Sequence, residues 1–216
     1  MPDRVTLFLG GDVMTGRGID QVLPHPSDPR LFEPYVKSAT EYVRLAEEKH
    51  GPLRKPVDYA YVWGDFLEDL DRVSPHARII NLETSVTADG SPWPDKGIHY
   101  RMHPGNVACF TAAGIDCCVL ANNHLLDWGR GGLVETLATL RGAGIATAGA
   151  GPDRREAQAP AVLNAGPNAR VLVFAFGAAS SGIPTEWAAA ERGAGVNFLP
   201  DLSPQALRSV AAQLLG

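Results

Sequence analysis

The chain has 216 residues and a formal net charge of -5, and 45% of its residues are hydrophobic while 20% are charged. This composition is typical of a soluble globular protein and supplies enough apolar residues for one complete core. No basic cluster is longer than the pair Arg154-Arg155, which argues against nucleic acid as a partner. We therefore expect a single domain over residues 1–216.

The start of the chain gives no sign of export or membrane insertion. Residues 1–4 lack the basic and apolar regions of a signal peptide. No apolar run approaches the roughly 20 residues that a membrane-spanning helix needs. The default expectation is a cytoplasmic protein without a membrane span.

The three cysteines are predicted to be buried thiols. Cys117 and Cys118 are neighbours in an apolar run, so they should face opposite sides of a strand, and Cys109 falls in a predicted helix. The spacing Cys-x-x-Cys is absent, and an odd number of cysteines does not form a disulfide framework. We expect neither disulfides nor cysteine metal ligands.

Apolar runs and amphipathic stretches alternate along the chain. In chain order, strands are predicted at 5–9, 77–82, 116–121, 161–164 and 170–176, and helices at 33–49, 63–73, 106–113, 132–142 and 204–215. Strands that alternate with helices are typical of an α/β fold with a parallel or mixed sheet.

Polar side chains follow three of these strands at the point where each strand ends. Asp12 follows the first strand, Glu83 the second, and Asn123, His124 and Asp127 the third. The carboxyl ends of parallel strands meet at one edge of a sheet, which is where ligands bind in open α/β folds. Carboxylate and amide oxygens together with an imidazole suit Mg, Mn, Fe or Zn. The alternative interpretation is a set of turns in which Asn and Asp satisfy backbone groups.

Two long loops are candidates for substrate contacts. The loop at 15–30 follows Asp12, and long irregular loops beside a site are often lids or specificity elements. The second loop covers residues 89–102. Arg17 in the first loop and Arg101 at the end of the second could bind an anionic group through bidentate contacts. Each arginine could equally pair with a nearby carboxylate on the surface.

These motifs resemble the capsule-synthesis (CapA, poly-γ-glutamate) family. The resemblance is carried by Gly11-Asp12-Val13-Met14, Asn81-Leu82-Glu83 and Asn122-Asn123-His124 with Asp127 and Gly129, and it extends from about Val5 to the end of the chain. That family belongs to the calcineurin-like metallophosphatase superfamily. The resemblance therefore implies an α/β/β/α sandwich with parallel or mixed sheets.

The resemblance also implies a site with one or two divalent ions of Mn, Fe, Zn or Mg. Asp12, Glu83 and Asn123 would be the metal ligands, and their side chains should converge within about 4–8 Å of a common point. His124 would stabilise developing charge or protonate the leaving group, and Asp127 would hold its ring in the productive tautomer. A small-molecule or poly-γ-glutamate-type anionic substrate and other capsule-synthesis proteins are the implied partners, and association with the cell surface is compatible with the family.

The chain departs from the superfamily pattern in three respects. Met14 stands where the first motif has a histidine, and Glu83 stands in place of the bridging aspartate. The family's later metal-binding histidines have no counterpart after Phe176, and the amphipathic stretch 204–215 is typical of a helix that precedes another strand. We expect a fragment without its C-terminal strands, which would leave an apolar edge or face exposed.

Two functions remain open at the level of sequence. The first is a metal-dependent hydrolase of a phosphoester or amide bond. The second is a non-catalytic capsule-assembly or binding component that keeps the fold with a degenerate metal site. Metal content would discriminate between them.

Overall fold

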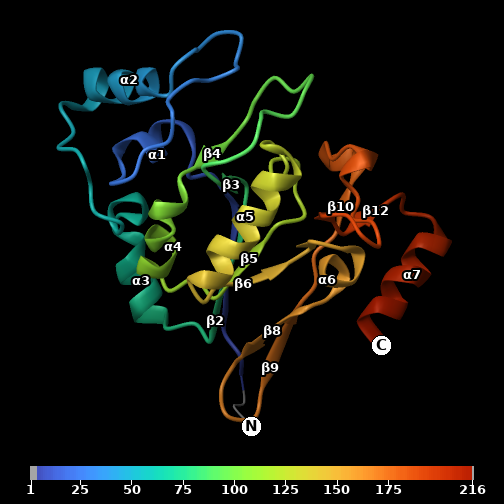
Figure 1. Cartoon of the computed structure of the whole chain (residues 1–216). Helices are drawn as coiled ribbons and strands as arrows, with labels where there is room; N and C mark the ends of the chain where they lie inside the picture. The colour runs from blue at the N-terminus through green and yellow to red at the C-terminus, as the bar shows by residue number, and fades with distance from the viewer. Residues whose placement is uncertain (1–3, 216) are drawn as a thin grey trace.

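The computed structural model describes residues 4–215. Its centre is a parallel four-stranded sheet in the order β1 (Leu7–Val13), β2 (Ala77–Leu82), β5 (Cys117–Val119) and β6 (Ala146–Ala148). Because all four strands are parallel, their carboxyl ends lie at the same edge, which Figure 1 shows at the end of the sheet nearest the β3 and β4 labels. The predicted α/β architecture with a parallel sheet is confirmed.

Seven α-helices are found among the described residues. They are α1 (Arg17–Val22), α2 (Thr40–His50), α3 (Phe66–Val73), α4 (Ala108–Ala112), α5 (Gly129–Gly142), α6 (Arg154–Gln158) and α7 (Pro204–Leu215). Short 3-10 helices occur at Tyr61–Trp63, Pro104–Asn106, Ala179–Ser181 and Thr185–Trp187. α3, α4 and α5 contribute residues to the core on one face of the sheet, and α1 and α2 extend that layer at one side (Figure 1).

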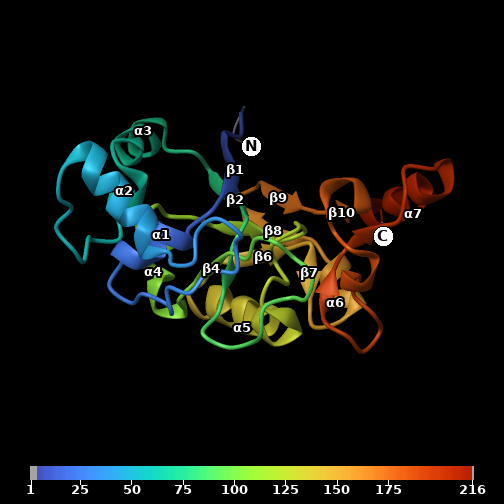
Figure 2. The same ribbon diagram turned by 90° about the horizontal axis from the view of Figure 1, so that it is seen from above.

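The remaining strands are short and pair in twos. They are β3 (Ser85–Val86) with β4 (Arg101–Met102), β7 (Ala150–Gly151) with β11 (Gly195–Val196), β8 (Ala161–Asn164) with β9 (Arg170–Val173), and β10 (Gly177–Ala178) with β12 (Phe198–Leu199). The β8–β9 pair is an antiparallel hairpin on the face of the sheet opposite α5 (Figure 2). The layers are therefore helices, sheet and hairpin, which is consistent with an α/β sandwich.

Successive side chains of a strand point to opposite faces of the sheet, so the hydrophobic core is divided into two clusters, one on each face. Ile80 and Cys118 pack with the helices, whereas their neighbours Ile79 and Cys117 pack with the hairpin. All three cysteines are free and buried, as predicted. Burial raises the pKa of the Cys109 and Cys117 thiols to about 12 and raises the pKa of the Cys118 thiol well above its ordinary value.

An apolar part of the sheet edge is exposed. β1 is an edge strand, and the side chains of Leu7 and Leu9 are 40% and 69% exposed. Apolar side chains of the hairpin, Val162 and Leu172, are also more than half exposed. In the described part of the chain, no helix is both long and apolar enough to cross a membrane.

Several predicted boundaries were wrong. The first strand runs to Val13 and not to residue 9, because the glycines at 10 and 11 continue alongside β2. The loop at 15–30 is not wholly irregular, since it contains α1. The helix expected over 33–49 begins only at Thr40, because residues 30–38 close into a turn through backbone bonds between Leu31 and Lys37. β6 was missed because three residues, two of them alanine, give no periodic signal.

Candidate functional site

A bulge at the end of β1 sets the position of Asp12. Gly10 pairs with Ile80 and Val13 with Leu82, so two residues of β1 face one residue of β2. Asp12 adopts a left-handed backbone with φ of 52°, and such conformations outside glycine concentrate at functional sites. Its Oδ1 accepts a hydrogen bond of 2.8 Å from Nδ2 of Asn81. The bulge therefore turns the Asp12 carboxylate toward the end of β2.

A chain of amides connects Asp12 to the turn after β5. Asn122 donates through Nδ2 to Oδ1 of Asn81 at 3.0 Å and to the carbonyl of Leu82 at 2.8 Å. Its own Oδ1 accepts from the backbone N–H of His124 at 3.0 Å. For Asn122 the turn interpretation is correct, because its amide satisfies backbone groups on both sides. The same bonds tie the ends of three strands together.

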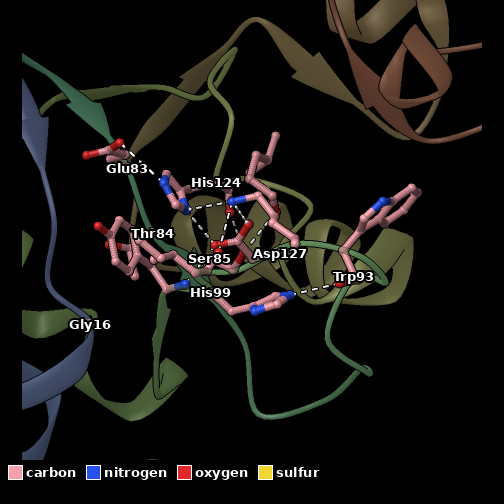
Figure 3. Close-up of polar contacts among 12 residues, drawn as sticks. Gly16, Glu83, Thr84, Ser85, Trp93, His99, His124 and Asp127 are labelled. Atoms are coloured by element: carbon pink, nitrogen blue, oxygen red, sulfur yellow. Dashed lines mark hydrogen bonds and ion pairs between the residues drawn. The ribbon is translucent and has the colours of Figure 1, made fainter. Parts of the chain in front are cut away.

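His124 forms a close pair with Asp127. Nδ1 of His124 lies 2.7 Å from Oδ2 of Asp127, and the carboxylate is fully buried (Figure 3). A carboxylate oxygen at this distance accepts a hydrogen bond, so the proton is assigned to Nδ1 of the imidazole. Nε2 then carries the lone pair and points away from Asp127 toward Glu83. This arrangement suits proton transfer at Nε2.

Asp127 has further partners that compensate its charge. Lys96 Nζ lies 2.9 Å from Oδ1, and the backbone N–H of Tyr100 donates to Oδ2 at 2.7 Å. Lys96 Nζ is also 3.2 Å from Nδ1 of His124. A buried carboxylate requires such partners, because desolvation of an unpaired charge is costly. Lys96 is 19% exposed, so the ion pair reaches the border of solvent.

Glu83 lies on the other side of the imidazole. Its Oε1 is 3.6 Å from Nε2 of His124, and its backbone N–H donates to the carbonyl of Val13. The Glu83 side chain is 23% exposed, whereas that of His124 is 8% exposed. Nε2 therefore faces a carboxylate that is partly open to solvent.

The ring of Tyr100 stacks on the imidazole, and the guanidinium of Arg17 lies over the Tyr100 ring. The rings of Tyr100 and His124 are 4.0 Å apart between centroids and 23° from parallel. Arg17 Cζ lies 4.9 Å from the centre of the Tyr100 ring and 5.2 Å from that of Tyr42. Arg17 is ion-paired with buried Glu33 at 2.6 Å, and Tyr42 donates its hydroxyl to the same carboxylate. Burial and this hydrogen bond raise the pKa of Tyr42 to about 12.

The predicted metal ligands lie on segments that meet at this end of the sheet. Asp12 Oδ2 and the side chains of Glu83 and Asn123 accept or donate no hydrogen bond within the described part of the chain. Asn123 faces Gly182, where a Cβ would lie 3.5 Å from its Nδ2. Free carboxylate and amide oxygens match the donors that hard divalent ions take.

A metal here would need donors beyond acidic and imidazole groups. Over residues 4–215, no three His, Cys, Asp or Glu side chains gather closely enough to hold an ion. The predicted set contains two carboxylates and an amide, so it is compatible with that finding and stays a prediction.

The two predicted substrate-binding arginines differ in their surroundings. Arg17 is engaged by Glu33 and the two tyrosines. Arg101 stacks on Trp128, with Cζ 3.7 Å from the ring centre, and no described residue forms an ion pair with it. The substrate role of both remains a prediction, and only Arg101 retains a guanidinium without a carboxylate partner.

Sequence reasoning missed the roles of Lys96 and Tyr100. Both lie in the loop at 89–102, which is close to the turn after β5 only in the folded chain. Lone Lys and Tyr residues in a loop carry no spacing signal that would assign them to a site 27 to 31 residues away.

Comparison with known proteins places the chain in a family. The family model described as bacterial capsule synthesis protein PGA_cap matches residues 6–214. Two curated relatives, both described as probable polyglutamine synthesis accessory proteins, come from Mycobacterium tuberculosis strains CDC 1551 / Oshkosh and ATCC 25618 / H37Rv. Each is 47% identical over 215 residues, which cover 99% of this chain and 57% of the relative.

The chain thus spans little more than half the length of these relatives. Its family membership rests on a match that covers nearly all of its residues, including each strand end described above. The chain belongs to the bacterial capsule synthesis protein family PGA_cap.

Proposed function

We propose that this chain is a hydrolytic component of capsule polymer synthesis that acts on an anionic substrate of the poly-γ-glutamate type. Family membership supports the biological setting, and the names of the relatives support an accessory role in synthesis of a glutamine-type or glutamate-type polymer. The hydrolytic part of the proposal rests on the side chains at the carboxyl end of the sheet.

The observation that carries this proposal is the pair of His124 and Asp127. The bond of 2.7 Å to a fully buried carboxylate selects one tautomer and directs Nε2 toward the partly exposed Glu83. A histidine oriented in this way is a general acid or base, and such a group contributes about 10²–10⁴ in rate. A turn that served only packing would not need an imidazole held by a buried carboxylate.

The surrounding residues hold the imidazole of His124 in the orientation that this role requires. Lys96 and the Tyr100 N–H hold the Asp127 carboxylate, and the Tyr100 ring restrains the tilt of His124. In the hydrolytic step, water adds to the scissile carbon or phosphorus while the bond to the leaving nitrogen or oxygen breaks. Nε2, which carries the lone pair, takes a proton from that water and gives it to the leaving atom, while Asp127 keeps the ring in position.

A divalent ion fits the donor chemistry of the site. Asp12, Glu83 and Asn123 would hold one or two ions of Mn, Fe, Zn or Mg, since Asp12 Oδ2 and the side chains of Glu83 and Asn123 form no hydrogen bond within the described part of the chain. When bound, such an ion polarises the scissile group and lowers the pKa of a water molecule.

A non-catalytic assembly component is the second candidate. This candidate is favoured because polar side chains of the site already bond to other groups of the protein. Asn81, Asn122 and Asp127 all have such partners. A network of this kind also stabilises a sheet end without any chemistry.

One experiment distinguishes the two candidates. Hydrolysis of γ-glutamyl oligomers, phosphodiesters and phosphomonoesters is measured with added Mn²⁺ or Zn²⁺ for the wild type, His124→Asn and the control His50→Asn, which changes an exposed histidine at the end of α2. We expect hydrolysis of one substrate class by the wild type and the control, and a loss of about 10²–10⁴ for His124→Asn. Absence of hydrolysis in all three, or equal rates, would refute the catalytic proposal.

A further inference from the structure

A second polar cluster lies on the other side of the segment that carries Tyr100. Neighbouring residues of an extended segment point to opposite sides, so His99 and Arg101 face away from His124 while Tyr100 faces it. Figure 3 shows His99 directed away from the pair His124–Asp127 and toward Trp93. We call the group His99, Arg101, Trp128, Phe32 and Arg30 the arginine–aromatic cluster.

Arg101 is the central cation of this cluster. Its Cζ lies over the indole of Trp128, 3.7 Å from the ring centre, and it makes no hydrogen bond or ion pair with any side chain in the described ranges. Burial lowers the pKa of Arg101, yet an arginine at this position stays charged at physiological pH. A partly buried guanidinium with a stacked face and free N–H groups is the arrangement that recognises carboxylates.

Arg30 adds a second guanidinium. Its Cζ lies 5.2 Å from the centre of the Phe32 ring, and Phe32 in turn packs edge-on against Trp128 at 6.1 Å. After burial, the charges of Asp28 and Asp20 act most strongly on Arg101 and raise its pKa, and the charge of Arg30 lowers it. An anion beside both guanidinium groups would reduce the repulsion between them.

His99 gives an independent sign of a missing partner. The side chain of His99 is buried, with an exposed fraction of 6%. Its Nε2 is hydrogen-bonded to the carbonyl of Trp93 at 2.9 Å. Because a carbonyl accepts, Nε2 carries the proton and Nδ1 is an acceptor. Nδ1 is buried and has no hydrogen-bond partner in the described structure, and Ser27 Oγ is in the same condition. Native buried polar atoms are rarely left in this way.

These groups line one small cavity. Its volume is about 20 Å³, and its lining includes Arg30, Arg101, His99, Ser27 and Trp128 together with the carboxylates of Asp20 and Asp28. The acidic residues nearby do not neutralise the arginines by contact. Both oxygens of buried Asp20 accept hydrogen bonds, from Ser27 N and Gln21 on Oδ2 and from His103 N and Asn106 on Oδ1. Asp28 uses Oδ1 for the backbone of Arg30.

We propose that the arginine–aromatic cluster is a carboxylate-binding site, which takes one carboxylate of an acidic chain together with an adjacent N–H or O–H donor. The carboxylate pairs with the guanidinium of Arg101 and with Arg30, and the donor satisfies Nδ1 of His99. The cavity of about 20 Å³ has room for about one water-sized donor group beside His99, so the carboxylate and the rest of the ligand lie at its mouth. A γ-linked glutamyl unit carries both groups, an α-carboxylate and a neighbouring amide N–H.

This inference rests on the proposed function and deepens it, because it names the residues that would hold an anionic polymer. Its test measures ligand binding and not hydrolysis, so the two proposals can fail separately. Titration calorimetry uses the His124→Asn variant, so that no ligand is consumed. The probes are a γ-glutamyl oligomer, free glutamate, the corresponding uncharged γ-glutaminyl oligomer and inorganic phosphate. We expect the γ-glutamyl oligomer to bind and the uncharged oligomer not to bind.

Substitutions in the cluster identify the site. Arg101→Gln and Arg101→Lys should each weaken binding by about 10-fold to 100-fold, because a lysine cannot reproduce the planar fork. Arg30→Gln, at an exposed position, should weaken binding less and keep the fold. The control Arg72→Gln removes an exposed arginine on α3 and should leave binding unchanged.

Several results would overturn the proposal. The proposal fails if neither carboxylate probe binds, if the charged and uncharged oligomers bind equally, or if phosphate binds and the carboxylates do not. It also fails if the affinity is unchanged in Arg101→Gln and Arg30→Gln. If the oligomer binds at this cluster while the wild type hydrolyses nothing, the binding site stands and the hydrolytic function fails.

Discussion

The ring of Tyr100 stacks on the imidazole of His124 at 4.0 Å, while the backbone N–H of Tyr100 bonds the carboxylate that holds that imidazole. One residue of the 89–102 loop thus restrains both members of the pair His124–Asp127. The loop and the turn after β5 form a single unit, and the tilt of His124 depends on residues that are distant in sequence.

Tyr100→Leu should lower turnover by about 2-fold to 10-fold, because the stacked pair contributes roughly 0.5–1.5 kcal/mol to holding the ring. Tyr100→Phe keeps the ring and should retain nearly full activity. The measurement is kcat for both variants over a range of pH. Equal loss in Leu and Phe variants would assign the role to the hydroxyl and not to stacking.

Glu83→Ala and His124→Asn should have different effects on metal content. Removal of the Glu83 carboxylate takes away a charge that amide donors cannot replace, so the variant should lose its metal. His124→Asn should keep most metal while losing turnover. Elemental analysis of both purified variants is the measurement. If His124→Asn strips the metal as fully as Glu83→Ala does, His124 is a ligand and not a proton carrier.

Asp127→Asn should lower both activity and stability. The change leaves Lys96 without its carboxylate, and we expect a loss of about 2–3 kcal/mol, below the roughly 3–5 kcal/mol of a fully buried pair because Lys96 is partly exposed. The loss of turnover should be smaller than in His124→Asn, since Asp127 orients the ring and transfers no proton. Denaturant unfolding of Asp127→Asn, Lys96→Met and the double variant measures the coupling. Strict additivity of the two changes would contradict a direct pair.

The backbone conformation at Asp12 predicts which of two variants, Asp12→Gly or Asp12→Ala, is the more stable. Its φ of 52° is accessible to glycine without strain, whereas alanine there costs about 1 kcal/mol. Both Asp12→Gly and Asp12→Ala lose the acceptor of the Asn81 amide, so the difference between them isolates the backbone contribution. We expect the glycine variant to be the more stable by about 1 kcal/mol in thermal unfolding. The opposite order would show that the bulge relaxes on substitution.

The buried thiols make stability depend on pH at the alkaline side. Burial raises the pKa of Cys109 and Cys117 from 9.0 to about 12, so the folded state keeps protons that the unfolded state releases. Their contribution is fully present below pH 9 and is lost as pH rises from there through about 12. Unfolding free energy measured from pH 7 to 10.5 should fall above pH 9, and Cys109→Ala combined with Cys117→Ala should flatten this fall.

The sequence alone determined the class of fold and the positions of the polar strand ends. Apolar runs at 77–82 and 161–164 and the amphipathic stretch at 204–215 match β2, β8 and α7 in both bounds, because the run or spacing of apolar residues within each segment is enough to indicate its type. The motifs at Asp12, Glu83 and Asn123 also led to the family, which the comparisons confirm.

Tertiary structure decided which side chains act together. The contacts of Lys96 and Tyr100 with the pair His124–Asp127, the stacking of Arg101 on Trp128 and the unsatisfied nitrogen of His99 all join segments that are remote along the chain. The β1 bulge likewise depends on register with β2, which no pattern within β1 specifies. The local hydrophobic pattern indicates only which face of a helix or strand is buried. The contact partners of a side chain and its orientation depend on the packing of the whole chain.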